Sequence, residues 1–154
     1  MQPEGLDLLS DIKFKTVTAN GIKLRLAMQG SGPMVVLCHG WPESWYSWRH
    51  QIPALANAGY TVVAYDVRGY GESDKPHAVE AYTPKELASD VVGIGDALVF
   101  HRFITIGHDW GGPIALTTAL LYPDRVYATG SLSVPHSTRP PLPTLDLWRE
   151  LYKD

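Results

Sequence analysis

Short apolar runs alternate along this chain with segments whose apolar positions recur at helical spacing. Apolar runs rich in β-branched side chains predict strands. These runs cover residues 12–18, 22–27, 34–38, 60–65, 103–106 and 126–134. Apolar side chains three and four positions apart predict helices within residues 45–55, 84–98 and 114–122. Because helices separate the buried strands, the pattern predicts an α/β fold with a mostly parallel sheet and helices on both faces.

Local signals mark the ends of several of these elements. Asn20-Gly21 is typical of the tight turn in an antiparallel hairpin, which would join the first two strands. Residues 83–86 read Thr-Pro-Lys-Glu, a capping-box pattern with proline at the first helical position. Ser44 is a candidate N-cap for the helix that follows it, and Pro53 predicts a break in that helix.

The strongest chemical signal is Gly-His-Asp-Trp-Gly-Gly at positions 107–112, between a predicted strand and a predicted helix. Small residues around a strand–turn–helix connection are the layout of a nucleophile elbow, which holds one side chain on a strained turn. Asp109 stands where the familiar G-x-S-x-G pattern has serine. A carboxylate, with a reference pKa of about 3.9, is ionised near neutral pH and can displace a leaving group from saturated carbon, leaving an ester. The pattern therefore favours epoxides or alkyl halides as substrates, unless Asp109 only caps the helix.

Two further motifs follow predicted parallel strands. His-Gly-Trp-Pro at positions 39–42 can turn the Trp41 backbone N–H toward the nucleophile, and the Trp110 N–H would be the second donor of an oxyanion hole. The alternative is a glycine–proline turn without a catalytic role. In the loop at residues 66–73, Asp66 and Arg68 are predicted to form a stabilising ion pair. All three motifs lie at carboxyl ends of strands, where sites gather in open α/β sheets, and this favours the functional interpretation.

Composition narrows the function classes. The 154 residues suit one domain, and the net charge of −3 provides no basic surface for nucleic acid or anionic membrane. No apolar stretch reaches the length of a membrane span, and the first ten residues lack the pattern of a secretory signal. Cys38, the single cysteine, is expected to be a buried thiol in a reducing compartment, so we expect a cytoplasmic protein. No ligand spacing indicates a metal, and we expect no cofactor.

Together, the motifs at 39–49, 66–73 and 107–112 resemble those of an α/β-hydrolase-fold epoxide hydrolase, over about residues 14–135. The resemblance implies that residues 1–135 form the N-terminal half of the core domain and that residues 136–154 begin a truncated lid. It implies hydrolysis of a small apolar epoxide to a vicinal diol through a covalent ester on Asp109. The backbone N–H groups of Trp41 and Trp110 would stabilise the intermediate of ester hydrolysis.

In that family a histidine late in the chain, oriented by an acid, activates water, and lid tyrosines protonate the epoxide oxygen. None of the six histidines here lies at the position of that base. We therefore expect an incomplete fold, lacking the C-terminal strands and most of the lid, that is inactive alone. Its exposed sheet edge would favour self-association or binding of a complementary C-terminal segment.

Two alternatives remain open. The chain could be a haloalkane dehalogenase-type hydrolase, with the Trp110 indole N–H donating to the leaving halide. It could also be a truncated, non-catalytic fragment or the partner of a missing C-terminal half.

Overall fold

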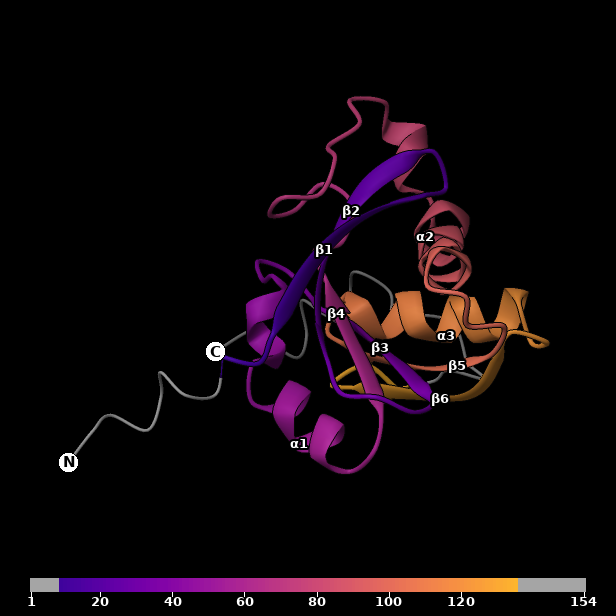
Figure 1. Ribbon diagram of the computed structural model, residues 1–154. Coiled ribbons are helices and arrows are strands. Elements are labelled where there is room, and N and C mark those ends of the chain that lie inside the picture. Colours follow the sequence, from indigo (N-terminus) through magenta and orange to yellow (C-terminus); the bar gives the residue numbers. More distant parts are fainter. Residues whose placement is uncertain (1–8, 136–154) are drawn as a thin grey trace, which may run out of the picture.

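The computed structural model describes residues 9–135, which form one six-stranded sheet with helices packed against it (Figure 1). The order of the strands in the sheet is β1-β2-β4-β3-β5-β6. The strands are β1 (Lys13–Ala19), β2 (Ile22–Gln29), β3 (Met34–Cys38), β4 (Thr61–Tyr65), β5 (Phe103–His108) and β6 (Val126–Leu132). The helices are α1 (Gln51–Asn57), α2 (Pro84–Ala97) and α3 (Gly111–Leu121), with 3-10 turns η1 (Trp45–Trp48) and η2 (Val79–Tyr82).

The sheet is antiparallel at its start and parallel afterwards, as predicted. β1 and β2 form a hairpin, and β2 runs antiparallel to β4. β4, β3, β5 and β6 are all parallel. At the hairpin turn, Asn20 and Gly21 have φ values of +47° and +76°, the left-handed pair that a tight two-residue turn requires. The Asn-Gly prediction is confirmed.

Alternation along the central strands produces two cores, one on each face of the sheet. In β3, Val36 and Cys38 pack with α2 and α3, whereas Val35 and Leu37 face η1 and α1. All five residues of β3 are buried, which explains its continuous apolar run. Figure 1 shows α1 on one side of the sheet and α2 and α3 on the other, so the prediction of helices on both faces is confirmed.

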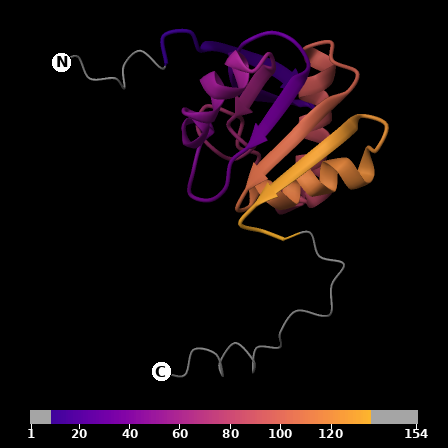
Figure 2. The ribbon, with the colours of Figure 1, turned by 90° about the horizontal axis from the view of Figure 1, so that it is seen from below.

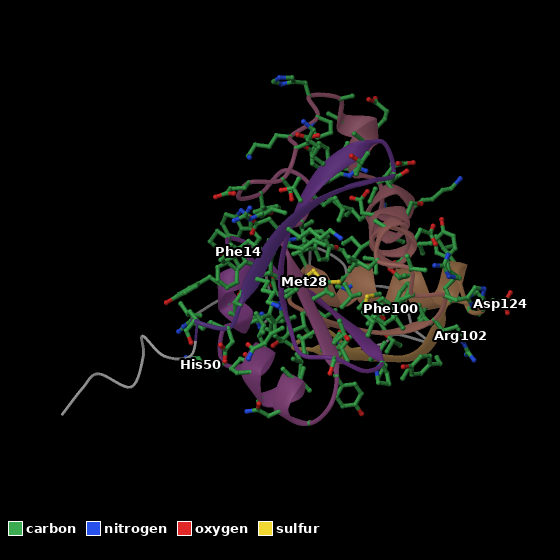
Figure 3. All side chains as sticks on the ribbon, viewed as in Figure 1. Phe14, Met28, His50, Phe100, Arg102 and Asp124 are labelled. Carbon is green, nitrogen blue, oxygen red and sulfur yellow. The ribbon has the colours of Figure 1, made fainter. Side chains whose placement is uncertain are left out.

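Phe14, labelled in Figure 3, connects the hairpin to the first helical turn, η1. Phe14 projects from β1, and its ring contacts the Trp45 ring edge-on with centroids 5.0 Å apart. The guanidinium carbon of Arg25 lies 4.5 Å from the centroid of the Phe14 ring. Phe14 therefore joins the edge of the sheet to η1 and is partly shielded from water.

The helix boundaries agree with the predicted caps, with two differences. Ser44 Oγ accepts from a backbone N–H of η1, and Thr83 Oγ1 accepts from the Glu86 N–H at 3.3 Å. Glu86 completes no capping box, because its carboxylate accepts from Asn20 instead. The predicted break at Pro53 is wrong: Pro53 lies inside the first turn of α1, where its missing N–H would have no helical partner.

Parallel pairing brings the three motif loops to one edge of the sheet. In the register of the strands, Cys38 at the end of β3 pairs with Tyr65 at the end of β4 and with Gly107 near the end of β5. Viewed from below, β6 lies beyond β5 at the edge of the sheet (Figure 2). Residues 136–154, the predicted start of the lid, lie outside the described residues.

Candidate active site

Asp109 lies on the turn between β5 and α3. Its φ is +52°, a left-handed conformation that a residue with a side chain rarely adopts, and such outliers cluster at functional sites. The backbone N–H of Asp109 donates to the Leu132 carbonyl at 3.3 Å, which ties the turn to β6. Trp110 is the N-cap of α3, and no side-chain cap hydrogen bond forms there. The alternative interpretation of Asp109 as a helix cap is therefore wrong.

Glycines allow the backbone to approach this turn closely. A Cβ on Gly40 would lie 2.6 Å from Asp109 Oδ1, and a Cβ on Gly107 would overlap the carbonyl oxygen of Gly111. In both cases the added Cβ would be much closer to its neighbour than van der Waals contact allows. The loop after β3 and the start of α3 can therefore reach Asp109 only because these positions carry no side chain.

Gly107→Ala is expected to lower the free energy of unfolding by about 2 kcal/mol or more, because its neighbour is backbone that cannot rotate away. Gly130→Ala, in the adjacent strand β6, is the matched control. Its new Cβ would meet only the Ile106 side chain, at 3.7 Å, so we expect a change within about 1 kcal/mol. Urea unfolding followed by circular dichroism measures both values; equal losses would refute the steric argument.

Two backbone amides hold the carboxylate of Asp109. The Trp41 N–H donates to Oδ1 at 2.9 Å. This hydrogen bond is the largest cause that lowers the pKa of Asp109, followed by a hydrogen bond from the Trp110 N–H. The side chain is therefore ionised at neutral pH, as a carboxylate nucleophile must be. The structure brings together the three residues that the sequence singled out.

Glu43 and His108 also belong to this arrangement, although no sequence pattern indicated a role for either residue. Glu43 Oε2 accepts from the Gly40 N–H at 3.0 Å, and Glu43 Oε1 lies 3.2 Å from His108 Nδ1. Glu43 thereby links the loop that carries Trp41 to the residue before Asp109. The signal that could have revealed it is a carboxylate three residues after a turn glycine, which is well placed to accept a backbone N–H.

The loop at residues 66–73 is stabilised differently from the prediction. Arg68 does not pair with Asp66 but forms a buried, two-point ion pair with Asp90 of α2, at 2.8 Å and 2.6 Å. The Asp66 carboxylate instead accepts the backbone N–H groups of Trp45 and Glu72. The predicted pair is wrong because a sequence neighbour was favoured over a partner that only folding brings near.

A hollow of about 190 Å³ opens beside the turn. It is lined by residues of the loops after β3 and β4, together with Trp110, Tyr82, Leu87 and Ile114. Tyr70, in the same lining, has its pKa raised by burial and by the Asp109 carboxylate. A larger hollow of about 790 Å³, lined by Phe14 and other residues, includes none of the residues around Asp109. The smaller hollow is the one that adjoins the turn, since Gly40 and Trp110 line it.

Within residues 9–135, no three side chains of the kinds that bind metals come together in a metal-binding group. In the same residues no helix is long and apolar enough to cross a bilayer.

A mostly parallel sheet that presents an acid on a strand–turn–helix connection, beside a backbone donor from a neighbouring loop, is the arrangement of the α/β-hydrolase fold. The family model described as alpha/beta hydrolase fold matches residues 33–153, and the chain belongs to this family. Within it, the chain is similar to epoxide hydrolases, which confirms the resemblance drawn from the motifs.

Epoxide hydrolase B of Mycobacterium tuberculosis is 57% identical over 108 residues, which cover 70% of this chain and 30% of that protein. Epoxide hydrolase A of the same organism is 46% identical over 140 residues, covering 90% and 44%. Among solved structures, an epoxide hydrolase from Vigna radiata has a TM-score of 0.84 and 41% identity, covering 94% of this chain and 45% of its own. The chain thus spans less than half the length of these relatives.

Proposed function

We propose that this chain carries the ester-forming half of an epoxide hydrolase site, with Asp109 as the nucleophile. The observation that supports the proposal most directly is the hydrogen bond from the Trp41 N–H to Asp109 Oδ1, 2.9 Å long, at a strained turn. It orients an ionised carboxylate on the sheet edge where α/β enzymes bind substrates. The similarity to proteins named epoxide hydrolases supports an epoxide as the electrophile.

In the first half-reaction, a carboxylate oxygen of Asp109 attacks a carbon of the epoxide ring. The bond between that carbon and the ring oxygen breaks, and the oxygen takes a proton from a hydroxyl donor or from water. The product is a hydroxyalkyl ester on Asp109. The exposed indoles of Trp41 and Trp110, which are 65% and 67% accessible, would line the approach of a small apolar epoxide.

In the second half-reaction, water adds to the ester carbonyl and releases the diol. The negative charge that develops on the carbonyl oxygen would be stabilised by the N–H groups of Trp41 and Trp110. Of the described histidines beside the site, His39 has both ring nitrogens bonded to backbone groups, and His108 contacts Glu43. We propose that the water-activating base lies outside the described residues, and we expect residues 9–135 to form the ester without hydrolysing it.

We further propose that residues 1–135 are half of the core domain and that residues 136–154 begin the lid over this site. β6 is the terminal strand of the described sheet, with Tyr127 and Leu132 44% and 49% exposed. Additional strands, from a complementary segment or from a second copy, would pair with this edge.

Haloalkane dehalogenation is the second candidate function. Trp110 follows Asp109 in the chain, is 67% exposed and lines the hollow beside the turn, so its indole N–H would be available to a leaving halide. Both reactions begin with an ester on Asp109, and they differ in the group displaced.

The two candidates are separated by the rates at which an epoxide and an alkyl bromide form an adduct on Asp109. The chain is incubated with 1,2-epoxyhexane or with 1-bromohexane and analysed by intact-mass and peptide spectrometry. We expect addition of the whole epoxide to the peptide that contains Asp109, with at least about 10-fold slower alkylation by the bromide. A faster reaction with the bromide would favour the dehalogenase. No adduct with either reagent, in a chain shown to be folded by circular dichroism, would leave the non-catalytic alternative.

A further inference from the structure

The peptide bond between Gly40 and Trp41 is held from both sides. Its N–H, on Trp41, donates to Asp109 Oδ1 at 2.9 Å. Its carbonyl oxygen, on Gly40, lies 2.8 Å from His39 Nδ1 and accepts a longer hydrogen bond from the Glu43 N–H, at 3.2 Å. The carbonyl and N–H of a planar trans peptide point in opposite directions. Whatever fixes the direction of the Gly40 carbonyl therefore also aims the Trp41 N–H.

The other ring nitrogen of His39 determines which proton the ring carries. His39 Nε2 lies 3.0 Å from the backbone nitrogen of Val67, which can only donate. Nε2 must therefore be the unprotonated acceptor, and the ring proton of neutral histidine resides on Nδ1. Nδ1–H then donates to the Gly40 carbonyl. Burial lowers the pKa of His39, against smaller opposing effects of the Gly40 carbonyl, Asp66 and Glu43, and favours this neutral form.

The ring has little freedom to move from this position. His39 is 1% exposed, and its ring packs edge-on against Tyr70 with centroids 5.1 Å apart. Val67 and Tyr70 belong to the loop in which the Asp66 carboxylate accepts the Glu72 N–H, and the same carboxylate ties the loop to η1 through the Trp45 N–H. A continuous set of hydrogen bonds thus runs from the Val67 N–H through the His39 ring to the Gly40–Trp41 peptide and on to Asp109.

We propose that His39 is a positioning residue: its neutral ring, protonated on Nδ1, sets the direction of the Gly40–Trp41 peptide and so aims the Trp41 N–H at Asp109. This inference goes beyond the proposed function and rests on it only in that Asp109 is the group to be oriented. The geometric claim itself needs no reaction for its test. Hydrogen bonds that are linked in series polarise each other. Loss of the His39 donor would therefore also weaken the hydrogen bond from the Trp41 N–H to Asp109.

Two substitutions separate the donor from the bulk of the ring. In His39→Asn the side-chain amide nitrogen can occupy the place of Nδ1 and donate to the Gly40 carbonyl. In His39→Gln the amide reaches toward the Nε2 position, and the Gly40 carbonyl keeps only the longer hydrogen bond from the Glu43 N–H, at 3.2 Å. His50→Gln, at an exposed histidine labelled in Figure 3, is the matched control.

The readout is a carbon-13 NMR titration of the Asp109 carboxyl, which requires no substrate. We expect His39→Gln to raise the pKa of Asp109 toward the ordinary value of 3.8, while His39→Asn and His50→Gln leave it lowered as in the parent chain. An unchanged pKa in His39→Gln, or an equal rise in His39→Asn, would overturn the proposal. The outcome is independent of whether any epoxide alkylates Asp109.

A measurement on the unsubstituted chain covers the case in which a His39 variant does not fold. Nitrogen-15 NMR of labelled histidine distinguishes the two neutral tautomers and the cation. We expect the His39 resonances at pH 7 to show a protonated Nδ1 and an unprotonated Nε2. A proton on Nε2, or a doubly protonated ring, is incompatible with the Val67 contact and would overturn the proposal.

Discussion

Asp109→Asn is expected to abolish covalent labelling of the chain by 1,2-epoxyhexane, with a loss of at least about 1,000-fold in the alkylation rate. A neutral amide oxygen is a far weaker nucleophile than a carboxylate. The fold should survive, because asparagine tolerates the left-handed φ of +52° that this position requires. The measurement is peptide mass spectrometry over time, with circular dichroism to confirm folding.

Asp124→Asn is the matched control for this experiment. Asp124, labelled in Figure 3, is exposed between α3 and β6, so its substitution should leave the labelling rate unchanged. Continued adduct formation on the 109-containing peptide of Asp109→Asn would refute the assignment of the nucleophile.

The pH dependence of the labelling rate provides a second check. Because two amides lower the pKa of Asp109, the labelling rate should fall to half of its maximum at a pH below the ordinary pKa of 3.8.

Asp90→Leu is expected to lower the free energy of unfolding by about 3–5 kcal/mol, because it removes one partner of a buried ion pair. The side chains of Arg68 and Asp90 are 3% and 1% exposed. Arg68 would keep only the carbonyl of Ala81, at 2.7 Å, as a hydrogen-bond acceptor. A guanidinium stays protonated in proteins even where it is buried, so Arg68 cannot escape the cost of burial by losing its proton. Urea unfolding measures the loss.

Two controls test whether the effect comes from the unpaired charge. Asp96→Asn breaks the pair with Arg125 in which Asp96 is 64% exposed, and it should cost less than about 1 kcal/mol. The double substitution Arg68→Met with Asp90→Leu removes both charges of the pair, leaves neither partner unpaired and should recover much of the lost stability. If the double variant were as unstable as Asp90→Leu alone, the loss would have to come from packing.

Much of the fold was predictable because its signals are local. The five-residue apolar run of β3, the Asn-Gly turn and the Thr83 cap each act through neighbours in the chain, and the structure confirms all three. The error at Pro53 has a local origin too. Proline breaks a helix only where its N–H would be needed, and the exact start of α1 decided that it was not.

The site was predictable only in part. Asp109, Trp41 and Trp110 were visible because glycine-flanked turns after strands have a characteristic sequence, and the structure places the Trp41 N–H at the carboxylate. The Arg68–Asp90 pair and the Glu43–His108 contact were not visible, because their members are far apart in sequence. Charged residues that become neighbours only after folding have no characteristic spacing in the sequence.

By itself, the sequence determined the succession of strands and helices along the chain, the mostly parallel sheet, and which three loops would meet at one edge. These follow from periodicity and from glycines that permit close backbone approach. Tertiary structure alone decided the directions of hydrogen bonds. The tautomer of His39, the aim of the Gly40–Trp41 peptide and the partner of Arg68 depend on Val67, Asp109 and Asp90, which folding brings to them across the sheet. Hydrogen bonds depend on distances and angles between atoms remote in the chain, and residue order alone does not specify these.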